Sequence, residues 1–170
     1  FTPYGDRERI EILVAGCGTG QHPIATAQRI QGAHILAVDL SRSSLCYAKR
    51  KTLELNEINE MNLLSIEFAQ ADLLLLASRG HTFDVIESSG VLHHLADPWA
   101  GWRVLLSILR TGGFMKLGFY SEIARREVVR IRDHIAARGY GSTPEEIRQY
   151  RQELLASDPS AGFGNTLMSP

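Results

Sequence analysis

Three glycines stand at alternate positions, Gly16, Gly18 and Gly20, directly after an apolar run. Glycine lets a backbone turn sharply and removes the Cβ atom that would keep a ligand at a distance. A turn of this kind at the start of a helix also directs unpaired backbone N–H groups outward. The spacing indicates a loop that approaches a small molecule; a tight strand-to-helix turn without a ligand is the alternative.

Polar residues also follow the later apolar runs. Asp39 lies 19 residues after Gly20, a spacing at which an acid accepts the hydroxyls of a ribose bound over the glycine turn. Asp72 ends the next run, and Ser88 stands at the end of the one after it, beside Glu87. Glu87 is expected to be a buried acid at a strand end, and such an acid needs a partner.

The glycine spacing separates two kinds of nucleotide ligand. The dinucleotide pattern G-x-G-x-x-G requires its third glycine at position 21 or 23, and these positions hold Gln21 and Pro23. An NAD-dependent oxidoreductase is therefore disfavoured. A neutral glycine turn with two acids and neighbouring apolar residues suits an adenosine without phosphates.

The elements that position these residues follow from the hydrophobic pattern. Apolar runs alternate with amphipathic segments five times, which predicts an α/β fold with a three-layer parallel sheet of at least five strands. The expected strands are 10–15, 33–40, 61–73, 83–89 and 114–120, and the expected helices are 21–31, 41–57, 98–109, 121–138 and 144–156.

Composition restricts the function classes. The 170 residues include 18 basic and 19 acidic side chains, with a formal net charge of −1, which gives no support to a nucleic-acid or membrane-surface partner. Two cysteines, Cys17 and Cys46, are too few for a disulfide framework or a zinc site, and no metal-ligand spacing is present. No apolar run approaches the roughly 20 residues that span a bilayer. We expect a cytoplasmic location and no metal.

The length suits one domain. We expect a domain over residues 1–157, with a core at 10–120 and a helical extension at 121–157, and a loose tail at 158–170. Both ends of the sequence look cut, since it opens on Phe1 and stops after Ser169 and Pro170. The chain is therefore expected to come from a longer protein.

The segments ILVAGCGTG, AVDLS, QADL and DVIESSGVLHHLADP occur in this order over residues 10–120. Together they resemble the class I S-adenosylmethionine-dependent methyltransferases. The resemblance implies a Rossmann-like sheet, S-adenosylmethionine as cofactor, S-adenosylhomocysteine as product, and an unidentified methyl acceptor, a small molecule or a protein. Residues 90–122 more narrowly resemble bacterial methyltransferase domains attached to tetratricopeptide-repeat arrays, which implies a flanking repeat domain.

The resemblance also implies roles for single residues at the strand ends. Asp39 takes the ribose hydroxyls, Leu40 packs beside the adenine, Asp72 accepts from the adenine amino group, Leu73 lies against the ring, and the Ser88 backbone lies near the methionine end. The implied cofactor-binding set is Ala15, Gly16, Cys17, Gly18, Gly20, Asp39, Leu40, Asp72, Leu73 and Ser88.

A proton acceptor is needed only where the acceptor atom must lose a proton. His93 and His94 follow the fourth strand, and adjacent side chains point in different directions, so we expect one of them, His93, to face the site. A histidine that only packs in the loop is the alternative. Trp99 and Trp102 are expected mainly to pack along their helix, where one of them borders a pocket.

Two departures from the family pattern favour a second hypothesis. Val14 stands where the family usually has an acid that helps to order the methionine amino group. After Tyr120 the sequence shows helices and no final antiparallel hairpin, so the fifth strand would be an open edge. The alternative function is therefore a catalytically inactive cofactor-binding module with an assembly or sensing role.

Overall fold

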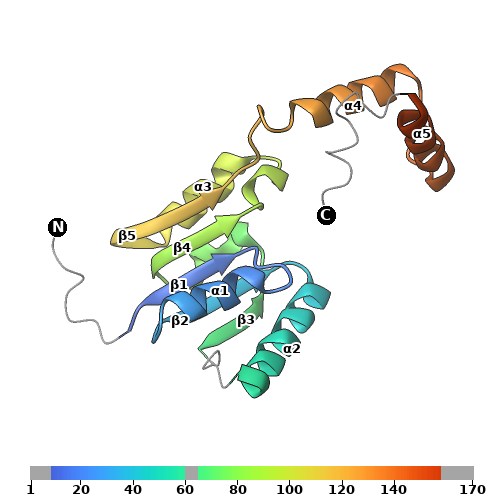
Figure 1. The fold of residues 1–170 in the computed structure, drawn as a ribbon. Helices are drawn as coiled ribbons and strands as arrows, with labels where there is room; N and C mark the ends of the chain where they lie inside the picture. Colours follow the sequence, from blue (N-terminus) through green and yellow to red (C-terminus); the bar gives the residue numbers. More distant parts are fainter. Residues whose placement is uncertain (1–8, 60–64, 158–170) are drawn as a thin grey trace. The chain divides into compact units, whose positions relative to one another are not determined.

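The computed structural model describes residues 9–59 and 65–157. The chain separates into two compact units, one that ends at Phe119 and one that begins at Tyr120. A parallel sheet with helices forms the first unit, and a pair of helices forms the second (Figure 1).

The first unit alternates strands and helices in the predicted order, with a short 3₁₀ helix after β3 and another after β4. Its elements are β1 (Glu11–Ala15), α1 (Gln21–Arg29), β2 (His34–Asp39), α2 (Arg42–Asn59), β3 (Ile66–Gln70), η1 (Leu73–Arg79), β4 (Phe83–Ser89), η2 (Leu92–His94), α3 (Pro98–Ser107) and β5 (Leu109–Gly118).

The five strands form one sheet in the order β3-β2-β1-β4-β5, and every neighbouring pair is parallel. The strand order reverses between β1, the central strand of the sheet, and its neighbour β4 (Figure 1). In such sheets ligands bind outside the carboxyl ends of the strands at this reversal. The glycine turn follows β1 there, as the sequence predicted.

Alternation along β1 divides the core into two layers. Ile12 and Val14 face one side, where they pack with residues of α1 and α2, and Leu13 and Ala15 face the other side, where η1, η2 and α3 cover the sheet. Successive side chains of a strand point to opposite faces, so one apolar strand supplies both layers. This arrangement confirms the predicted three-layer α/β fold.

Two strand boundaries were predicted wrongly. β3 ends at Gln70 and not at residue 73, and residues 61–64 of the predicted strand lie outside the described residues. β5 begins at Leu109 and not at residue 114, because the segment RTGG forms part of the strand and does not separate it from α3. Gly112 has a φ of 81°, and a Cβ on Gly113 would lie 2.7 Å from the Asp84 carbonyl oxygen, so these glycines permit an irregular, close approach to β4.

The second unit consists of α4 (Arg126–Ala137) and α5 (Pro144–Ser157). The sequence placed the start of α4 too early, at residue 121, and placed the start of α5 correctly. Thr143 and Glu146 form a capping box at α5, in which the Glu146 N–H donates to the Thr143 hydroxyl oxygen and the Thr143 N–H donates to the Glu146 carboxylate. The Thr143 hydroxyl and backbone N–H donors lower the pKa of Glu146.

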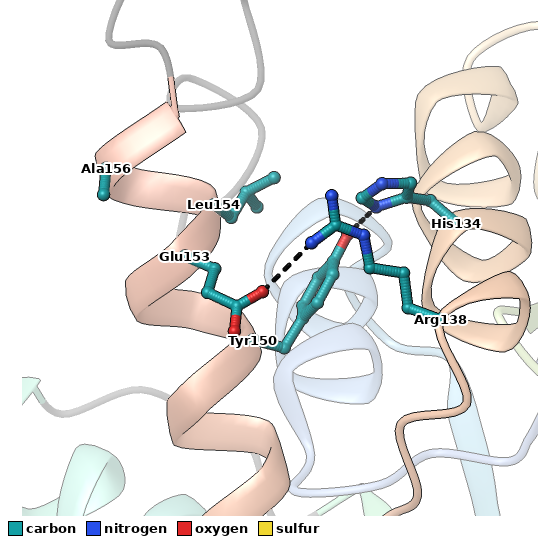
Figure 2. Close-up of a pocket in the computed structure, with 6 residues that line it drawn as sticks. All are labelled: His134, Arg138, Tyr150, Glu153, Leu154 and Ala156. Carbon is teal, nitrogen blue, oxygen red and sulfur yellow. Dashed lines mark hydrogen bonds and ion pairs between the residues drawn. The ribbon is translucent and has the colours of Figure 1, made fainter.

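A pocket of about 490 Å³ lies between α4 and α5. Figure 2 shows its two linking contacts: the ring of His134 meets the Tyr150 hydroxyl at 2.9 Å, and Arg138 pairs with Glu153 at 3.2 Å. The helices therefore hold each other through polar contacts at this point.

In residues 9–59 and 65–157 no antiparallel hairpin pairs with β5, and the tail predicted at 158–170 lies outside the described residues.

Candidate active site

The glycine turn leaves β1 and is fastened to β2. The N–H groups of Gly16 and Cys17 both donate to the Val38 carbonyl oxygen, at 2.8 and 2.9 Å. Gly16, Gly18 and Gly20 have φ values of 77°, 53° and 91°, a backbone region that side chains with a Cβ rarely adopt. The predicted turn is therefore present, and its shape depends on the glycines.

The three glycines differ in what surrounds them. A Cβ on Gly16 would lie 2.2 Å from Val91, and one on Gly20 would lie 2.7 Å from Ala48, so these two allow close packing. A Cβ on Gly18 would meet nothing within 4 Å. Only the Gly18 position borders open space, and this favours a turn that receives a ligand over one that only connects two elements.

Asp39 lies against this turn. Its Oδ2 accepts from the Gly18 N–H and its Oδ1 accepts from the Ser41 N–H, both at 2.8 Å. A carboxylate oxygen has two lone pairs, so each oxygen keeps one for a further donor. Both donors are uncharged backbone N–H groups. Leu40, the next residue, is 65% exposed and forms an apolar surface beside it.

Asp72 and Leu73 stand between β3 and η1. Asp72 caps η1, since its Oδ1 accepts from the Leu74 N–H at 2.9 Å. The Leu73 side chain is buried in the core with Leu76 and Leu105. Its proposed contact with the adenine ring stays a prediction, as does the role of Asp72.

Cys17, within the turn, is buried. Burial, and after it the neighbouring Asp39 carboxylate, raises the pKa of the thiol to about 11. The thiol is therefore protonated at neutral pH. Since the thiolate is the nucleophilic form, the Cys17 side chain contributes to packing.

The end of β4 brings two polar side chains to the site. The Ser88 hydroxyl is buried and makes no hydrogen bond within the described residues. On the opposite face, Glu87 Oε2 accepts from the Thr26 hydroxyl at 2.7 Å. Glu87 was not among the predicted cofactor-binding residues, although the sequence predicted a buried acid here that needs a partner; its partner Thr26 gave no signal in the sequence.

His93 lies in η2, directly after β4. Both of its ring nitrogens are buried, and its ring centroid lies 4.2 Å from that of His94, which is exposed. The structure thus separates the two histidines by burial. The role of His93 as a proton acceptor stays a prediction.

An apolar pocket of about 320 Å³ opens beside the start of α3. It is lined by Pro98, Trp99, Trp102 and Phe119, with the two indole rings stacked at 5.3 Å and an interplanar angle of 10°. Trp99 and Trp102 therefore pack on each other, as predicted, and both of them border the pocket, where the sequence predicted one. In the described residues no group of three or more His, Cys, Asp or Glu side chains has an arrangement that would hold a metal ion. The described helices also include none long and apolar enough to cross a membrane.

Comparison with known proteins agrees with this geometry. The family model of a methyltransferase domain matches residues 13–115. An uncharacterized protein of Synechococcus is 36% identical over 128 residues, which are 75% of this chain and 30% of that protein. A ubiquinone biosynthesis O-methyltransferase of Parvibaculum lavamentivorans is 33% identical over 64% of this chain and 39% of its own length. A tRNA 5-carboxymethoxyuridine methyltransferase of Escherichia coli is 34% identical over 67% of this chain and 41% of its own length.

Solved structures show the same fold. PKMT2 of Rickettsia typhi, in complex with AdoHcy, superposes with a TM-score of 0.65 at 20% identity, over 87% of this chain and 28% of that one. Coclaurine N-methyltransferase, bound to N-methylheliamine and SAH, has a TM-score of 0.56 at 22% identity, over 65% of this chain and 31% of that one.

The chain spans less than half the length of the three curated relatives named above. None of these names supports the narrower resemblance to repeat-linked domains, which stays a prediction. The family match, in contrast, covers the glycine turn, the strand ends and most of the sheet. The chain belongs to the methyltransferase domain family, within the class I S-adenosylmethionine-dependent methyltransferases.

Proposed function

We propose that this domain binds S-adenosylmethionine and transfers its methyl group to an acceptor, with S-adenosylhomocysteine as product. The observation that best supports this proposal is the bond from the Gly18 N–H to Asp39 Oδ2, because it places a charged carboxylate against an uncharged turn that borders open space. Such a site suits a ribose, and its glycine spacing differs from the pattern that binds a pyrophosphate.

The residues of the site fit this cofactor. Asp39 accepts the ribose hydroxyls with its remaining lone pairs, and Asp72 accepts from the adenine amino group with the carboxylate oxygen that does not cap η1. The Ser88 hydroxyl offers a buried polar atom that no described residue satisfies. When bound, the cofactor supplies a methyl group on an electrophilic sulfonium, so the protein's work is to bind, orient and exclude water.

His93 is proposed to take the proton where the acceptor atom must lose one. Its buried ring nitrogens suit proton transfer away from bulk water. We expect His93→Ala to lower kcat by about 10²- to 10⁴-fold and to leave the affinity for S-adenosylhomocysteine within about twofold. An unchanged kcat would show that His93 only packs in its loop.

The acceptor is proposed to be a small molecule or a protein. Curated relatives act on different acceptors, since one is named for ubiquinone biosynthesis and another for tRNA. Cys17 and Cys46 are both free, which suits the reducing cytoplasm where we propose that the protein works.

Calorimetric titration with S-adenosylmethionine, S-adenosylhomocysteine and NAD tests the binding step. We expect the first two to bind and NAD not to bind; binding of NAD alone would overturn the proposal. Incorporation of a labelled methyl group into small molecules and proteins of a cell extract tests transfer.

A cofactor-binding module without catalysis is the second candidate. Val14 at the end of β1, where the family usually has an acid, and the outer edge of β5, which pairs with no described strand, favour it. Binding of S-adenosylhomocysteine without any methyl transfer would support this candidate over the enzyme.

A further inference from the structure

One row of side chains crosses the central sheet beside the glycine turn. Val14 of β1 is in register with Glu87 of β4, and Glu87 is in register with Lys116 of β5. Residues in register on neighbouring parallel strands point to the same face. Glu87 therefore lies directly beside Val14, on the face that α1 covers. Val14 is two residues before Gly16, where the turn begins.

Glu87 is a half-buried carboxylate with a neutral anchor. Its side chain is 17% exposed, and the hydroxyl of Thr26, a buried residue of α1, donates to Oε2 at 2.7 Å. A buried carboxylate is costly unless a cation neutralises it, and a hydroxyl supplies no charge. Thr26 thus fixes the position of the carboxylate and leaves its charge in place.

The cation that faces Glu87 is held weakly. Lys116 Nζ lies 3.5 Å from Oε1, and the lysine side chain is 66% exposed. The separation is long for an ion pair and solvent screens the exposed lysine, so another cation can replace Lys116 at small cost. Asp39, by comparison, lies on β2, where one carboxylate oxygen accepts from the Gly18 N–H of the turn and the other accepts from the Ser41 N–H, just after β2.

We propose that Glu87 binds the ammonium group of the methionine part of the cofactor, with Thr26 as the residue that positions its carboxylate. This inference rests on the proposed function. The acid missing at Val14 is then supplied by the neighbouring strand at the same register position, and Lys116 neutralises Glu87 when no cofactor is bound.

Glu87→Gln tests this assignment because it removes the charge and keeps the shape. S-adenosylhomocysteine carries the ammonium group, and 5′-methylthioadenosine lacks the whole amino-acid part. We expect the variant to bind S-adenosylhomocysteine about 10- to 100-fold more weakly than the wild type, in line with the loss of a charged hydrogen bond. Its affinity for 5′-methylthioadenosine should stay within about twofold.

Two further variants sharpen the test. Thr26→Val removes the anchoring hydroxyl and should weaken S-adenosylhomocysteine binding in the same direction by a smaller factor. Glu11→Gln is the matched control, because Glu11 is also a half-buried strand acid, bonded to His34 at the opposite end of the sheet. It should change neither affinity.

The outcomes separate the inference from the proposed function. An equal loss for both ligands in Glu87→Gln would show a structural role and overturn the inference, as would no loss for either. If Glu87→Gln fails to fold, the affinities of the wild-type domain for the two ligands provide the test. Equal affinities would overturn the inference. Tighter binding of S-adenosylhomocysteine than of 5′-methylthioadenosine, with an intermediate loss of that affinity in Glu87→Asp, would support it. A wild-type domain that binds neither ligand would overturn the proposed function itself.

Discussion

The two ends of the sheet hold their acids in different ways. At the carboxyl end, Asp39 is held by the backbone N–H groups of Gly18 and Ser41. At the amino end, Asp84 of β4 is fully buried, accepts from the Glu11 N–H at 2.9 Å and pairs with the Arg110 guanidinium at 2.6 Å. One carboxylate meets neutral donors, and the other meets a cation.

This difference separates stabilising acids from acids available to a ligand. The charge of Asp84 is neutralised within the protein, so it contributes to the fold and offers nothing to a ligand. Asp39 is instead held by uncharged donors, next to a turn that borders open space at Gly18. Parallel strands place their carboxyl ends together where backbone turns begin, and neutral N–H donors are therefore abundant at that end.

Asp84→Ala should produce the largest effect on stability. It leaves the half-buried Arg110 without its partner and removes the acceptor of the Glu11 N–H. Breaking a buried pair from one side typically costs about 3–5 kcal/mol of unfolding free energy. Urea unfolding followed by circular dichroism measures this cost.

Arg103→Ala is the matched control for that variant. Arg103 pairs with Asp97 at 3.1 Å, but both side chains are exposed, and exposed pairs contribute roughly 0–1 kcal/mol. A loss in Asp84→Ala no larger than the loss in Arg103→Ala would contradict the structural role of the amino-end acid.

Asp39→Ala should act mainly on binding. It removes the proposed acceptor of the ribose hydroxyls, and we expect the affinity for S-adenosylhomocysteine to fall by about 1–3 kcal/mol, the usual cost of unpaired polar groups. Calorimetry measures this loss, with Asp133→Ala, an exposed acid of α4, as the control. Unchanged affinity would show that Asp39 is not the ribose ligand.

The sequence predicted the carboxyl end well because the information there is local. The glycine turn, its distance to Asp39 and the alternation of strands and helices follow from short segments. β4 was predicted at its exact bounds, since its apolar pattern stops at polar residues on both sides. The start of β5 was missed because a glycine pair that usually breaks an element here permits a bulge.

Contacts between distant segments could not be predicted from the sequence. Thr26 and Glu87 are 61 residues apart, and Asp84 and Arg110 are 26 apart, so neither pair leaves a periodic or motif signal. Leu73 shows the same limit: its position after Asp72 was predictable, but the burial of its side chain against α3 depends on tertiary packing.

Gly18→Ala and Gly16→Ala separate conformation from packing within the turn. Both positions have a positive φ, which costs an alanine about 1–2 kcal/mol. Gly16→Ala also drives a methyl group into Val91, so it should destabilise the domain more than Gly18→Ala. Urea unfolding ranks the two variants. A Gly18→Ala variant as unstable as Gly16→Ala would show that the space beside Gly18 is filled.

The smallest effect is expected from His34, whose ring lies 2.6 Å from Glu11 and 3.1 Å from Glu67 at the amino end. The hydrogen bond to Glu11, partly opposed by burial, raises the pKa of His34. Its stabilisation is therefore fully present below the unfolded pKa of about 6.5 and is lost as pH rises through the folded pKa. His34→Gln should cost up to about 1 kcal/mol near pH 5.5 and progressively less as the pH rises towards about 9. Urea unfolding at both pH values measures the difference. A loss of unfolding free energy that does not depend on pH would show that His34 contributes by packing and not by pairing its charge with Glu11 and Glu67.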